Sequence, residues 1–93
     1  MEKIINSNNK KLDLIKGIVE KIEIINNSKY LRNIYIKDDE NRLYKTIINT
    51  RYTGDLKIND NIIIEGVAIK FLEYYKLISY KIYYNERDFL LCK

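Results

Sequence analysis

The feature that most constrains the fold is a series of Ile-rich runs in which apolar and polar residues alternate, separated by short clusters of turn-forming residues. An alternation of period two puts apolar side chains on one face of a β-strand and polar side chains on the other. The runs cover residues 14–25, 32–37, 42–48, 61–71 and 77–84. The sequence therefore predicts an all-β domain built from five strands.

The first of these runs also fits a helical stripe of isoleucines, so a helix is the competing interpretation. We favour a strand, because Ile and Val dominate the run and Gly17 lies inside it. In a regular strand, Ile18, Ile22 and Ile24 share one face and Val19 lies on the other.

The second and third runs flank four turn-forming residues, Asp38 to Asn41, and this arrangement predicts a β-hairpin. Folding the hairpin about Asp39 and Glu40 places Lys37 opposite Arg42. The outer face of the hairpin is then expected to carry Tyr35, Lys37, Arg42, Tyr44 and Thr46. The inner face is expected to carry Ile34, Ile36, Leu43 and Ile47.

The chain of 93 residues suits one domain, and its apolar share of 46% is enough to build a core. We expect an N-terminal arm over residues 1–11, a barrel over 12–84 and a C-terminal tail over 85–93. The tail contains the apolar segment Phe89-Leu90-Leu91, which we expect to cover the barrel or to dock on another chain.

The order of these features resembles the OB-fold (oligonucleotide/oligosaccharide-binding) family over residues 12–84. The resemblance rests on Gly17 in a long first strand, the tight hairpin at 34–41, the segment 56–66 that ends in a glycine, and a closing fifth strand. It implies a five-stranded Greek-key barrel. In this family the connection between strands three and four often carries a helix, and the connection at 49–59 looks abbreviated by comparison. An SH3-like barrel is the main alternative, and the long first strand argues against it.

Several chemical classes are excluded by residues that the chain lacks. It contains no His and a single Cys, Cys92, and its three glycines are isolated. We therefore expect no catalytic residues, no metal site and no cofactor. No apolar stretch approaches the roughly 20 residues of a membrane helix, and the start of the chain has no signal-peptide core. These features predict a cytoplasmic or nuclear protein without membrane contact.

Barrels of this family bind ligands on the face of strands two and three, framed by two loops. Tyrosines and cations lie on all three of these parts, which is the combination that stacks bases and neutralises phosphates. The candidate binding residues are Lys29, Tyr30, Arg32, Tyr35, Lys37, Arg42, Tyr44, Thr46, Arg51, Tyr52, Tyr74, Tyr75 and Lys76. The prediction is a single-stranded nucleic-acid binder of the kind used in replication, with DNA favoured over RNA.

Two alternatives stay open. The net charge of +4 is modest, and an AT-rich genome would by itself enrich Lys and Tyr, so the tyrosines could serve sheet packing alone. The chain also resembles the smallest subunits of replication protein A and of telomere-capping complexes, which are lone OB barrels held mainly by protein contacts. That resemblance implies an adaptor in a homo- or hetero-oligomer.

Overall fold

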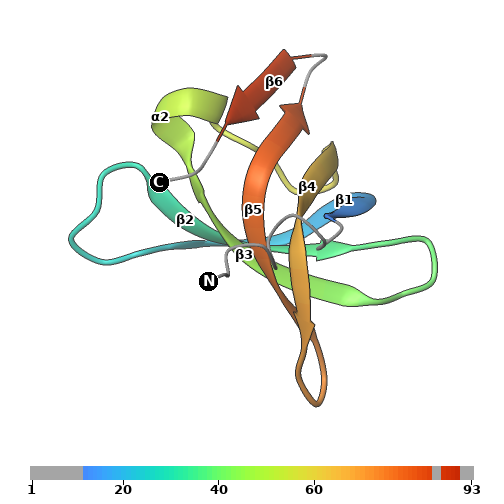
Figure 1. Ribbon diagram of the computed structural model, residues 1–93. Helices are drawn as coiled ribbons and strands as arrows, with labels where there is room; N and C mark the ends of the chain where they lie inside the picture. The colour runs from blue at the N-terminus through green and yellow to red at the C-terminus, as the bar shows by residue number, and fades with distance from the viewer. Residues whose placement is uncertain (1–11, 85–86, 91–93) are drawn as a thin grey trace, which may run out of the picture.

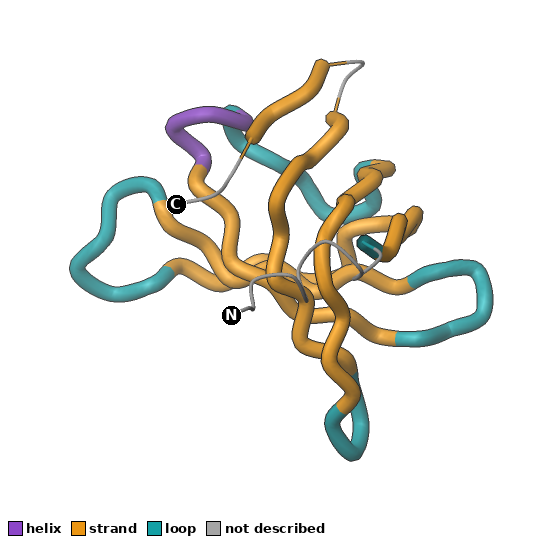
Figure 2. Tube along the Cα trace, viewed as in Figure 1, coloured by secondary structure: helices purple, strands orange, loops and turns teal. Residues whose placement is uncertain are grey.

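The computed structural model describes residues 12–84 and 87–90 of the chain, and most of this part is β-strand (Figures 1 and 2). The elements are β1 (Asp13–Ile24), β2 (Leu31–Lys37), β3 (Leu43–Asn49), α2 (Thr50–Thr53), β4 (Asn61–Lys70), β5 (Tyr75–Tyr84) and β6 (Arg87–Leu90). The predicted all-β fold is confirmed, and each of the five predicted strands is present. The strand interpretation of the first run is also confirmed.

The first five strands close into a barrel. Neighbouring strands are antiparallel in the order β3-β2-β1-β4-β5. The circle is completed by a short parallel pairing of β3 with β5, in which Tyr44 lies beside Tyr75 and Lys45 beside Lys76. The predicted five-stranded Greek-key barrel is thereby confirmed.

Strand β1 serves both halves of the barrel and changes partner at Gly17 and Ile18. Its first half pairs with β4 and its second half with β2, and Ile18 is paired in both registers. A side chain at Gly17 would bring its Cβ to 2.5 Å from the carbonyl oxygen of Lys37. The glycine therefore permits the close approach of β1 and β2 at the bend.

The prediction that Ile18 shares one face of β1 with Ile22 and Ile24 is wrong. Val19 is fully buried, whereas Ile18 and Ile24 are exposed. The pairing of β1 with β2 shifts register between Val19 and Lys21, so the strict alternation of the sequence is broken there. Ile22 packs against the core beyond this irregularity.

The hairpin of β2 and β3 is confirmed, but its register differs from the prediction by one residue. Asn41 adopts a left-handed φ of 65°, and Asp38 and Arg42 close a three-residue loop through a backbone hydrogen bond of 3.1 Å. Lys37 therefore lies opposite Leu43. A slip of one residue exchanges the two faces of the returning strand.

The exchange of faces corrects the placement of four side chains on β3. Tyr44 and Thr46 were expected outside, yet both are 4% exposed and point into the barrel. Ile47 was expected inside and is 53% exposed, and Leu43 is only half-buried. On β2, Ile34 and Ile36 are buried as predicted.

The barrel interior is filled mainly by isoleucine. The fully buried side chains are Val19, Ile34, Ile36, Ile48, Ile62, Ile64 and Ile82. Branched residues of this kind pack well on the concave face of a small barrel. The core is therefore built from alternate positions of every barrel strand.

Two elements lie outside the barrel strands. The connection between β3 and β4 is abbreviated as predicted: α2 is a single turn, whose Arg51 N–H is capped by the side chain of Asn49. Strand β6, within the predicted tail, pairs with β5 over residues 81–84 and was not predicted (Figure 1). The predicted arm at 1–11, and Leu91 and Cys92, lie outside the described residues.

Candidate functional site

The outward face of β1, β2 and β3 presents two rows of side chains across the strands. The registers of the two strand pairs define them. The first row is Lys21–Tyr35–Lys45, and the second is Glu23–Asn33–Ile47. We call these six residues the outer face. Tyr35 is the predicted residue among them, and Lys37, which was also predicted to project outward, lies in a neighbouring row with Ile18 and Leu43.

Tyr35 lies between two cations. The Lys21 ammonium is 5.3 Å and the Lys45 ammonium 5.6 Å from the centre of its ring. Both distances are within the range of a cation–π interaction. An aromatic ring and two positive charges are thus presented together at the middle of the outer face.

Glu23 introduces one negative charge beside this cluster. Its carboxylate pairs with Lys21 at 3.1 Å and accepts a hydrogen bond of 3.3 Å from the Tyr35 hydroxyl. The hydrogen bond from Lys21, together with the positive charges of Lys21 and Lys45, lowers the pKa of Glu23. The carboxylate is therefore ionised at neutral pH.

A groove of about 520 Å³ begins where β3 and β5 separate, and it continues beneath the β4–β5 hairpin. It is lined by Asn33, Lys45, Thr46, Ile47, Phe71, Tyr74, Lys76, Leu77, Ile78 and Ser79. The hydroxyls of Thr46 and Ser79 are 2.7 Å apart and join the two strands in its lining. The groove thus combines two lysines with apolar and aromatic side chains.

The hairpin that overhangs the groove carries its own aromatic pair. Phe71 and Tyr74 stack at 5.2 Å between ring centres and 14° between planes. Figure 1 shows this hairpin projecting well away from the barrel. Two nearly parallel rings of this kind offer a flat surface on which a further planar group can stack.

A second basic–aromatic cluster joins the β1–β2 loop to α2. The Lys29 ammonium is 5.6 Å and the Arg51 guanidinium 5.7 Å from the ring centre of Tyr30. The backbone N–H of Thr50 donates to the carbonyl of Tyr30 at 2.8 Å, which fixes the loop against α2. The predicted residues Lys29, Tyr30 and Arg51 are therefore brought together.

The remaining exposed candidates are dispersed. Arg32 donates from Nη1 to the carbonyl of Leu31, and Lys37 lies 3.7 Å from Glu20. Tyr52 is 57% exposed on α2. None of these three lines the groove.

Tyr44 and Tyr75 are structural in this fold. Their rings stack at 5.0 Å, and Tyr44 is buried while Tyr75 packs against the core. The Tyr44 hydroxyl donates to Asp38 at 3.1 Å. Burial, and then this hydrogen bond, raises the pKa of Tyr44 to about 12. The prediction that Tyr44 projects from the outer side of the hairpin is therefore wrong.

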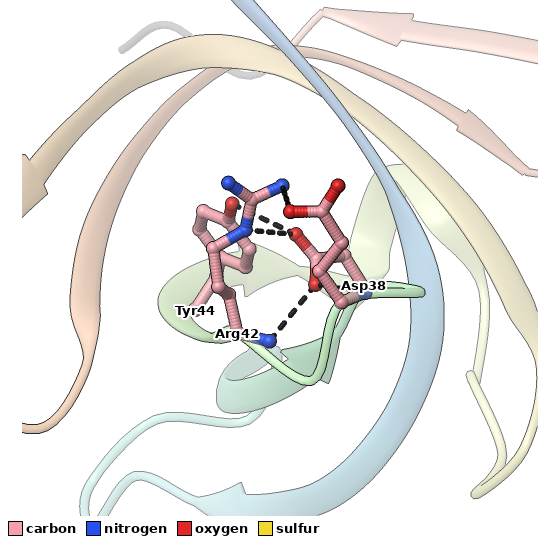
Figure 3. A network of polar contacts seen from close by, with 4 residues as sticks. Asp38, Arg42 and Tyr44 are labelled. Atoms are coloured by element: carbon pink, nitrogen blue, oxygen red, sulfur yellow. Dashed lines mark hydrogen bonds and ion pairs between the residues drawn. The ribbon is translucent and has the colours of Figure 1, made fainter.

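Arg42 is likewise held by Asp38, as Figure 3 shows. The Asp38 carboxylate accepts from the backbone N–H groups of Glu40 and Arg42, from Arg42 Nε at 2.8 Å and from Tyr44. Burial acts to raise the pKa of Asp38, but these hydrogen bonds outweigh it and hold that pKa below its ordinary value. Arg42 also pairs with Glu40, so its positive charge is paired with carboxylates of the hairpin itself.

A larger cleft of about 1110 Å³ lies beside the first half of β1. Its lining contains three positively charged residues, Lys16, Lys37 and Arg42, and three negatively charged residues, Asp38, Asp39 and Asp60. The opposite charges offset each other, and Asp60 already accepts from Tyr84 at 2.5 Å. Compared with the groove, this cleft gives an anionic ligand little reason to bind.

Sequence reasoning missed Lys21, Asn33, Lys45, Ile47, Phe71 and Ile78, which line the outer face or the groove. Two of these misses, Lys45 and Ile47, follow from the slipped hairpin register, because both lie on β3. The signal that could have corrected it is Asn41, because Asn is one of the residues that tolerates a left-handed conformation at the third position of such a loop.

No protein family, curated protein or solved structure matches this chain. Within residues 12–84 and 87–90, no three His, Cys, Asp or Glu side chains are grouped so that they could hold a metal ion. The same residues include no helix with the length and apolar character needed to cross a bilayer.

Proposed function

We propose that this protein is an OB-fold protein that binds single-stranded nucleic acid without catalysing a reaction. The family assignment is supported by the strand order, the parallel β3–β5 closure and the bend of β1 at Gly17. The binding assignment has a separate basis, which is the composition of the outer face and of the groove.

The observation that carries the proposal is the position of Lys45. It approaches the ring of Tyr35 on the outer face, and it also lines the groove with Tyr74 and Lys76. A strand of nucleic acid that crosses here meets aromatic rings for its bases and ammonium groups for its phosphates. The aromatic rings are reachable by unstacked bases, whereas the bases of a duplex are stacked on one another.

The test is fluorescence anisotropy with labelled single-stranded DNA, single-stranded RNA and duplex DNA of equal length, at several salt concentrations. Replacing Tyr35 by Ala removes one stacking ring, and we expect a loss of about 1–3 kcal/mol in binding free energy. The matched control is Tyr83→Ala, because Tyr83 carries a lysine, Lys81, at 5.7 Å from its ring yet lines neither the outer face nor the groove.

We expect the control variant to bind like the wild type. The proposal is overturned if no single-stranded oligonucleotide binds at low salt, or if both tyrosine variants lose affinity equally. Comparison of the DNA and RNA arms tests the preference for DNA.

An adaptor subunit is the second candidate function. The observation in its favour is an apolar stripe of Leu12, Leu14 and Ile18 at the start of β1, each between 37% and 58% exposed. Apolar side chains that gather on a surface are typical of protein interfaces. A stable oligomer in size-exclusion chromatography, combined with an absence of oligonucleotide binding, would favour this function over the first.

A further inference from the structure

Glu23 is an unexpected residue on a surface that is otherwise suited to an anion. In the two rows of the outer face it is the one acidic side chain, and it lies two residues along β1 from Lys21 of the cation–ring–cation row. A carboxylate at this place repels a phosphate that approaches Lys21. Its presence therefore needs a functional or structural reason.

Structural reasons are weak. The Glu23 side chain is 38% exposed and that of Lys21 is 61% exposed, so the pair is well solvated. Exposed ion pairs contribute little to folding stability. The hydrogen bond from the Tyr35 hydroxyl is long, at 3.3 Å, and is only partly buried.

The geometry has a clear consequence for a ligand. Glu23 Oε2 holds the Lys21 ammonium at 3.1 Å, and Glu23 Oε1 accepts from Tyr35. One carboxylate thus binds two of the three residues in the first row. A phosphate that is to be met by Lys21 must replace Glu23 as its partner.

We propose that Glu23 is an internal competitor for nucleic-acid phosphate, which occupies Lys21 and Tyr35 in the free protein and so limits affinity at this face. The inference rests on the proposed function, because the ligand that Glu23 opposes is the nucleic acid bound there. On binding, Lys21 exchanges the carboxylate for a phosphate oxygen. Tyr35 is released from its hydrogen bond in the same exchange.

The test is Glu23→Gln, which removes the charge and keeps the shape of the side chain. Binding of an unstructured oligo(dT) of about 15 nucleotides, long enough to cover one barrel, is measured by anisotropy. At about 0.1 M salt the charges of remote residues are largely screened. We expect affinity to rise about three- to tenfold and the slope of log K against log salt to steepen by about 0.7, which is the value for one further phosphate contact.

Two further variants separate this exchange from a general change of charge. Glu65→Gln makes the same change on β4, at a residue that lines neither the outer face nor the groove, and is expected to alter affinity less than about twofold. In a Lys21→Ala background the gain from Glu23→Gln should disappear, because no lysine is left to be released. None of these three side chains is buried, so folding should be retained.

The outcomes distinguish the two proposals. If the wild type binds but Glu23→Gln binds no more tightly than Glu65→Gln, the competitor role is overturned and nucleic-acid binding stands. If the gain persists without Lys21, Glu23 acts by simple repulsion and the exchange is overturned. Binding by Glu23→Gln alone would support the competitor role and count against binding by the natural protein. If neither protein binds, both proposals fail.

Discussion

The two tyrosines that the hairpin register assigns to opposite faces, Tyr44 and Tyr35, should respond very differently to loss of their hydroxyl groups. Tyr44→Phe removes a donor to Asp38, whose side chain is 7% exposed. A hydrogen bond to a buried charge contributes about 1.5–3 kcal/mol. Asp38 keeps its bonds from Glu40 and Arg42, so we expect the variant to lose about 1–2 kcal/mol.

Tyr35→Phe is the matched comparison. Its hydroxyl makes one long, partly buried hydrogen bond, to Glu23, and we expect a change within about 0.5 kcal/mol. Urea denaturation followed by circular dichroism gives both values, and equal m-values would show that the same surface is exposed in each case. For a domain of this size a loss of 1 kcal/mol lowers Tm by about 4–8 °C. A larger loss for Tyr35→Phe than for Tyr44→Phe would show that the register is wrong.

Three other perturbations test the packing. Gly66→Ala places a Cβ against the backbone carbonyl oxygen of Ile78 in β5 and should lower the free energy of unfolding by about 3 kcal/mol or more. A thermal unfolding curve like that of the wild type would contradict this close approach. Ile47→Thr, on the exposed face of β3, should change the free energy of unfolding by less than about 0.5 kcal/mol. Ile48→Thr, in the core, should lower it by about 2–4 kcal/mol. Equal urea midpoints for the two variants would refute the assigned faces. Hydrogen bonds lower the pKa values of Asp38 and Asp60 on folding. The two carboxylates therefore stabilise the folded protein above about pH 4, and this contribution is lost as pH falls through the lowered pKa values. A Tm that does not change with pH in that range would exclude this linkage.

Much of the fold could be predicted from the sequence because strand alternation is a local signal. The predicted strand positions agree with the structure to within about two residues at most ends, and Gly17 marks the bend of β1. Such positions depend on runs of neighbouring residues, which the sequence displays directly.

The faces of β3 could not be predicted in the same way. Both sets of alternate residues on this strand contain large apolar side chains, Leu43 and Ile47 in one and Tyr44 and Ile48 in the other. The structure nevertheless buries Tyr44 and Thr46, because the loop contains one residue more than a two-residue turn. A backbone conformation at Asn41 thus decides which side chains form the site.

The short parallel pairing that closes the barrel has a consequence of its own. It places Lys45 beside Lys76, so two positive charges repel each other where the wall of the barrel is joined by the fewest residue pairs. Both lysines also line the groove. An anion bound between them would reduce the repulsion and so stabilise the pairing of β3 with β5. Binding at this site and the free energy of unfolding of the barrel would then be thermodynamically linked.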